Sequence, residues 1–92
     1  MELFEIGEIQ FDRKRLVVEV YGYTFSTGYH GKSVARQRMV RFYYTSVKSR
    51  LFTQHWLSTQ KQAKGCKTVI EGFQALVGTK VLIPTKMMMA LD

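Results

Sequence analysis

Cysteine and long apolar runs are both scarce in this chain, and each scarcity excludes a class of protein. The single cysteine, Cys66, has no second cysteine with which to form an intrachain disulfide. The first residues lack the basic and apolar segments of a signal peptide, and no stretch approaches the ~20 apolar residues needed to span a bilayer. We therefore expect a cytoplasmic protein that has no membrane partner.

Negative charge is absent from the middle of the chain. Residues 20–70 hold nine lysines and arginines and no aspartate or glutamate, whereas residues 1–19 hold three cations and five anions. The formal net charge of +7 therefore arises in the middle segment, which also contains nine of the twelve aromatic residues. This combination predicts a polyanionic partner.

Composition and periodicity predict one small α+β domain. Apolar residues make up 46% of the chain, which is enough to form one hydrophobic core. With 92 residues the chain is too short for two domains. We expect residues 1–84 to form the domain and residues 85–92 to form a methionine-rich tail. The expected architecture is a three-stranded antiparallel sheet followed by one long helix, one short helix and a final short strand, and the alternative is an OB-like five-stranded barrel with one helix. The expected elements are strands at 3–11, 16–25 and 34–45, helices at 46–64 and 69–77, and a strand at 81–83.

Local signals predict where the helices begin, where they end and which faces they bury. Ser46 is the expected N-cap of the long helix and Gly65 its expected C-cap. Thr68 and Glu71 have the spacing of a capping box for the short helix. Gly22 interrupts a strand pattern and predicts a bulge or a bend. The apolar face expected for the long helix consists of Val47, Leu51, Phe52, His55 and Trp56, with Trp56 as its core anchor.

The densest cations follow a glycine-containing loop and predict contacts with nucleic acid. Lysine and arginine bind phosphates, and aromatic side chains stack on bases in proteins that bind single strands or RNA. We therefore expect a non-enzymatic nucleic-acid-binding protein that needs no cofactor and no metal. This hypothesis requires the cations to lie close together in space. The expected phosphate contacts are Lys32, Arg36, Arg38, Arg41, Lys48 and Arg50, and the expected stacking residues are Tyr29 and Tyr43.

Two other functions are compatible with the sequence. A small adaptor or inhibitor would dock the same basic face on an acidic partner protein, and the methionine-rich tail offers an apolar surface for homo-oligomer formation. A metal-independent ribonuclease of the toxin type would need His30 and His55 to meet at one phosphodiester as general acid and base. A P-loop is excluded at residues 26–33, because that motif requires glycine where this chain has Ser26.

Overall fold

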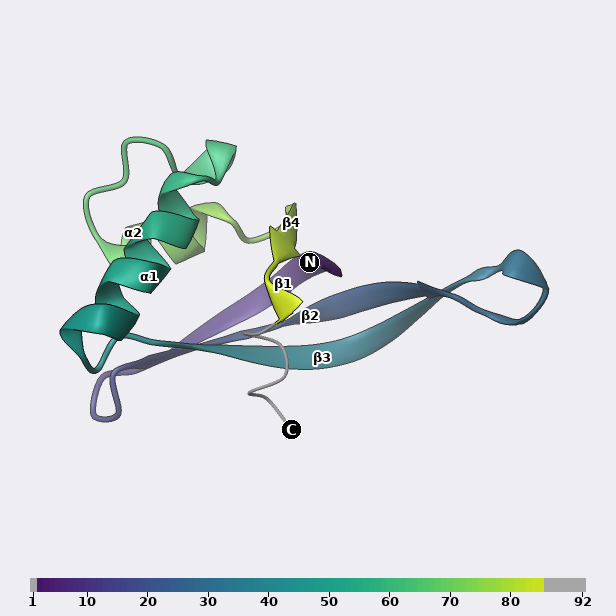
Figure 1. Ribbon diagram of the computed structural model, residues 1–92, viewed down its shortest axis with the longest axis horizontal. Helices are drawn as coiled ribbons and strands as arrows, with labels where there is room; N and C mark the ends of the chain where they lie inside the picture. The colour runs from purple at the N-terminus through teal and green to yellow at the C-terminus, as the bar shows by residue number, and fades with distance from the viewer. Residues whose placement is uncertain (1, 86–92) are drawn as a thin grey trace.

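The computed structural model describes residues 2–85, apart from the side chains of Thr27 and Tyr29. Figure 1 shows a long curved sheet with two helices packed over one half of it. Of the expected methionine-rich tail, residues 86–92 lie outside the described range, so the role of the tail stays a prediction. The elements in chain order are β1 (Glu2–Asp12), β2 (Val17–Thr27), the 3-10 turn η1 (Tyr29–Gly31), β3 (Ser33–Tyr43), α1 (Val47–Ser58), the 3-10 turn η2 (Lys61–Ala63), α2 (Val69–Ala75) and β4 (Lys80–Ile83).

All four strands belong to one antiparallel sheet with the strand order β3-β2-β1-β4. The predicted α+β class and the order of elements are confirmed. The sheet has four strands rather than three, because the final strand pairs along the free edge of β1 and extends the same sheet. The sheet curls into a half-barrel, a shape compatible with the OB-like alternative, although residues 2–85 contain four strands instead of five.

The core lies between one face of the sheet and the two helices. Val18 and Val20 of β2 lie opposite Phe42 and Val40 of β3, and all four side chains are buried. The residues between them point to the other face, as strand geometry requires. Neither helix covers that other face, which we call the open face.

An aromatic cluster joins the helices to the sheet. The ring centroid of Phe42 lies 4.8 Å from the ring centroids of both Trp56 and Phe73. The indole N–H of Trp56 donates a hydrogen bond to the backbone carbonyl of Leu82 at 3.1 Å, which ties α1 to β4. The prediction that Trp56 anchors its helix in the core is confirmed, since only 5% of the residue is exposed.

Helix α1 begins where the sequence predicts and ends earlier. The hydroxyl of Ser46 accepts a backbone N–H of the first turn at 3.1 Å, which confirms this residue as the N-cap. The hydroxyl of Thr59 and the side-chain amide of Gln60 both donate to the carbonyl of Trp56, at 2.6 and 3.2 Å. These side chains satisfy an acceptor that a further helical turn would have used. The predicted end at Gly65 is therefore wrong.

The buried face of α1 also differs from the predicted one. Thr53, Trp56 and Leu57 face the core, and the Thr53 hydroxyl donates to the carbonyl of Tyr43 at 3.1 Å. This hydrogen bond allows a polar residue to take a core position that the apolar pattern assigned elsewhere. The residues wrongly predicted to be buried are Val47, Leu51, Phe52 and His55, all of which are exposed.

Helix α2 is short, with seven residues from Val69 to Ala75. The hydroxyl of Thr68 accepts the backbone N–H of Glu71 at 3.1 Å, which confirms the predicted start of the helix. A Cβ atom on Gly72 would lie 3.2 Å from Cδ1 of Leu57, so glycine allows α1 and α2 to approach closely. No helix within residues 2–85 has the length and apolarity needed to cross a membrane.

The bulge predicted at Gly22 of β2 occurs instead in the neighbouring strand, β1. The pairing of β1 with β2 shifts register between Ile6 and Glu8, which places a β-bulge at Gly7. Gly22 itself stays in the ladder and pairs with Ile6. A Cβ atom on Gly22 would lie only 1.9 Å from the backbone oxygen of Glu5, so glycine is required where the two strands approach so closely.

Candidate nucleic-acid interface

The β2–β3 hairpin projects beyond the two helices (Figure 1). In the described part of the chain, Thr24 is the last β2 residue that pairs with β1, and beyond it β2 pairs with β3 alone. We call residues 22–38 the distal ribbon. Its outer strand, β3, is an edge of the sheet, and the side chains of residues 33–37 are all exposed. Between residues 25 and 37, the described side chains of the distal ribbon are therefore exposed on both of its faces.

Three of the expected phosphate contacts lie on the distal ribbon. Arg36 and Arg38 lie on the face of β3 that includes the buried Val40, because alternate residues of a strand share a face. Arg36 is exposed, Arg38 is half-buried, and Lys32 is exposed where the turn enters β3. Residues 22–38 contain no aspartate or glutamate. The distal ribbon thus carries three positive charges and no negative charge of its own.

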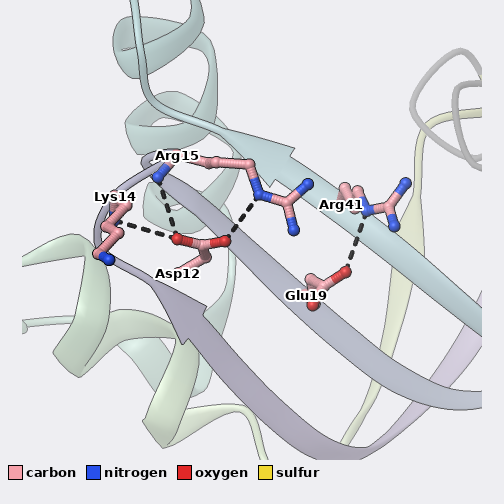
Figure 2. A network of polar contacts seen from close by, with 5 residues as sticks. All are labelled: Asp12, Lys14, Arg15, Glu19 and Arg41. Atoms are coloured by element: carbon pink, nitrogen blue, oxygen red, sulfur yellow. Dashed lines mark hydrogen bonds and ion pairs between the residues drawn. The ribbon is translucent and has the colours of Figure 1, made fainter.

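Arg41 lies on the open face and already has an acidic partner. Its Nε atom is 3.0 Å from Oε2 of Glu19, the residue directly opposite on β2 (Figure 2). Because this carboxylate offsets its charge locally, Arg41 adds little to a field that attracts phosphate. Tyr43, one of the expected stacking residues, is 44% exposed and ends β3 at the opposite end from the distal ribbon.

The cations on α1 lie far from those on the distal ribbon. Lys48 and Arg50 follow the end of β3, whereas Lys32 precedes its start. An 11-residue strand spans about 33 Å. The structure therefore separates the expected phosphate contacts into two groups, and the condition that they all lie close together is not met. The hypothesis of one interface that includes all six cations loses its support. A further group, Lys61, Lys64 and Lys67, belongs to the connection between the helices.

The two histidines occupy different regions of the molecule. His30 lies in the turn at the tip of the distal ribbon, where its backbone φ is +60°. His55 is exposed in the last turn of α1, and Figure 1 shows that helix and the ribbon tip at opposite ends of the long axis. This placement argues against the two groups acting as acid and base on one phosphodiester.

Two tyrosines that the sequence analysis did not assign lie beside the ribbon cations. Tyr21 and Tyr23 alternate with Gly22 on β2 and point to the open face. Tyr23 is 39% exposed, and its hydroxyl accepts a hydrogen bond from the side-chain amide of Gln37 at 3.3 Å. The alternation of residues 21–25 and a hairpin turn centred on residue 30 would have indicated this pairing. Of the expected stacking residues, Tyr29 has a side chain outside the described set.

The turn between β1 and β2 holds a second polar network (Figure 2), and this turn lies at the opposite end of the long axis from the tip of the distal ribbon (Figure 1). Oδ1 of Asp12 accepts the backbone N–H groups of Lys14 and Arg15, each at 3.0 Å. Oδ2 of the same carboxylate lies 2.8 Å from Nε of Arg15. The backbone and side-chain hydrogen bonds from Arg15 lower the pKa of Asp12 and favour its charged form. The network therefore fixes the turn and partly neutralises its cations.

No family model matches the chain, and no curated protein or solved structure shows significant similarity to it. Within residues 2–85, no three histidine, cysteine, aspartate or glutamate side chains are grouped as metal ligands. The fold and the site define a small α+β protein with a projecting basic hairpin.

Proposed function

We propose that the protein binds single-stranded nucleic acid or RNA through the distal ribbon. Lys32, Arg36 and Arg38 supply the phosphate contacts. The observation that carries this proposal is the composition of the ribbon, three cations and no anion within residues 22–38. Neutralising phosphates with such side chains releases condensed counterions, which favours binding.

The shape of the hairpin supports the same function. Since neither helix covers the distal ribbon, a nucleic-acid backbone can approach it without colliding with the rest of the domain. The edge position of β3 brings Arg36 and Arg38 close to the rim of the sheet. The binding element is thus narrower than the sequence suggested, because Lys48 and Arg50 lie beyond the other end of β3.

Salt dependence tests the proposal. Binding of a fluorescein-labelled single-stranded RNA of about 12 nucleotides is followed by anisotropy between about 50 and 200 mM salt. Three phosphate contacts give a slope of log K against log salt of about −2, so the affinity should fall about 16-fold over this range. The double variant Lys32→Ala/Arg36→Ala should reduce the slope to about −0.7.

A matched control separates the ribbon from net charge. Lys61 and Lys64 are exposed and lie between the helices, so Lys61→Ala/Lys64→Ala lowers the net charge by the same amount. We expect this control to keep the wild-type slope. An equal loss in both double variants would show that binding follows overall charge and not the distal ribbon. Absence of wild-type binding at about 50 mM salt would disprove the nucleic-acid function itself.

A second candidate function, docking of an acidic partner protein, is favoured by the outer surface of α1. Val47 and Leu51 lie one turn apart on the side away from Thr53, and they are 67% and 59% exposed. Lys48 and Arg50 flank them on either side of the helix, and no anion occurs in α1. Self-association through this stripe would bring like charges together, so the complementary partner is an apolar segment flanked by carboxylates.

A designed peptide tests this second candidate. The probe is a labelled helical peptide of about 20 residues with leucines on one face and glutamates beside them. Leu51→Gln should weaken binding about tenfold or more, because it removes one leucine from the contact. Val77→Gln is the matched control, since Val77 is also exposed, at 46%, but lies beyond α2. If lysine replaces glutamate in the peptide without loss of binding, charge complementarity is not involved and the candidate is wrong.

A further inference from the structure

An open hollow of about 580 Å³ lies on the sheet at the base of the distal ribbon. Its volume falls within the range of about 300–1,000 Å³ that is usual for small-ligand sites. The bulge explains why the hollow exists. Gly7 has no partner in the ladder between Ile6 and Glu8, and it contributes no side chain to fill the space beside Tyr21 and Tyr23.

The lining of the hollow combines aromatic rings with hydrogen-bonding groups. Tyr21 and Tyr23 project from β2, while Gln37 and Met39 project from the neighbouring positions of β3. The hydrogen bond from Gln37 to the hydroxyl of Tyr23 restrains that ring at the rim. Glu8 adds a carboxylate.

These groups match a flat, aromatic ligand with polar edges. Tyrosine rings and a methionine side chain contact the face of such a ligand, while an amide and a carboxylate bind N–H and carbonyl groups at its edge. Arg38 also lines the hollow and carries a charge opposite to that of Glu8. The cation Arg36 is adjacent to Gln37 along β3, on the opposite face of this edge strand. The ligand chemistry is that of an unpaired nucleobase whose own phosphate lies at the rim.

We propose that the hollow is a base-binding subsite, an inference that rests on the nucleic-acid function proposed above. One unpaired base stacks against Tyr23 with Tyr21 beside it, and Gln37 and Glu8 bind the edge of that base. The neighbouring phosphate contacts Arg36. In a duplex the bases are paired and stacked on one another, so this subsite selects single strands over double-stranded nucleic acid.

Tyrosine variants test the subsite with the same single-stranded RNA. Loss of one stacking platform should lower the affinity about 5- to 100-fold in Tyr23→Ala, with no change in the salt slope, because no phosphate contact is removed. Tyr23→Phe keeps the ring and should recover most of the affinity. Phe52→Ala is the matched control, since Phe52 is an exposed aromatic residue, at 45%, on α1. A duplex of the same sequence should bind at least tenfold more weakly than the single strand.

The outcomes distinguish the subsite from the function on which it rests. If Tyr23→Ala binds as wild type while Lys32→Ala/Arg36→Ala loses its salt slope, the distal ribbon binds nucleic acid but the hollow does not bind a base. Equal affinity for duplex and single strand would also overturn the subsite. If wild type binds neither, the nucleic-acid function fails. Circular dichroism and urea unfolding of each variant check that Tyr23→Ala folds, and the comparison of duplex with single strand in the wild-type protein keeps the test decisive if it does not.

Discussion

Replacement of Gly22 by alanine is the sharpest test of the geometry that joins the core to the distal ribbon. A Cβ atom at this position would lie 1.9 Å from the backbone oxygen of Glu5 and 2.7 Å from Cε1 of Phe4. The phenylalanine ring is completely buried, and the oxygen belongs to β1, which is paired on both sides, with β2 and β4. Neither neighbour can move without disturbing the sheet.

The expected loss of stability follows from the displacements that an added Cβ atom would force on β1 and on the core. Separating β1 from β2 locally would sacrifice about two backbone hydrogen bonds, each worth about 1 kcal/mol. Overpacking of the adjacent core adds about 1–3 kcal/mol. The variant Gly22→Ala should therefore lower the free energy of unfolding by about 3–5 kcal/mol, a large fraction of the stability of a small domain.

Urea unfolding followed by the fluorescence of Trp56 measures this change, with the midpoint compared at constant m value. Gly72→Ala is the control. Its Cβ atom would meet only the flexible end of Leu57, at 3.2 Å, while alanine raises helix propensity by about 1 kcal/mol. The net change in the control should stay within about 1 kcal/mol of wild type. A cost below about 1 kcal/mol for Gly22→Ala would refute the close approach of β1 and β2.

Two further predictions concern single polar groups. Thr53→Val keeps the side-chain volume but removes the hydrogen bond to the carbonyl of Tyr43. The free energy of unfolding should therefore fall by about 1–2 kcal/mol in the same urea assay. An unchanged value would contradict the role of this hydroxyl. The pKa of Asp12 is lower in the folded protein than its ordinary value, so its carboxylate stabilises the fold above the unfolded-state pKa, and this stabilisation is lost as the pH falls through the folded-state pKa. The difference in free energy of unfolding between wild type and Asp12→Asn should be constant above about pH 4 and shrink in acid. An ordinary pKa for the Asp12 carboxyl, measured by NMR titration, would contradict the hydrogen bonding at the turn.

Much of the fold is predictable from the sequence because it depends on neighbouring residues. Strand alternation placed Arg36 and Arg38 on the same face as Val40, and the hydroxyls of Ser46 and Thr68 marked the starts of both helices. Alternation and capping arise from backbone sterics and from hydrogen bonds that span three residues, so a short window of sequence contains the information.

The end and the buried face of α1 were not predictable in this way. The side chains of Thr59 and Gln60 end the helix, and Thr53 is buried because it meets Tyr43, a residue of the preceding strand. The apolar pattern instead placed Leu51 in the core, where the structure has it 59% exposed. A hydrogen bond to the sheet outweighs helical periodicity at this position, and periodicity carries no information about such a bond.

The candidate site, like the fold, was predictable from the sequence only in part. The amino-acid sequence is enough to show that residues 20–70 are basic and aromatic, and to predict a small α+β domain. The long β2–β3 hairpin, the separation of Lys32 from Lys48 by an extended β3, and the position of Tyr23 opposite Gln37 beside the bulge at Gly7 are known from the structure alone. Charge is a property of each residue, whereas the distance between charges depends on strand length, register and the position of a bulge.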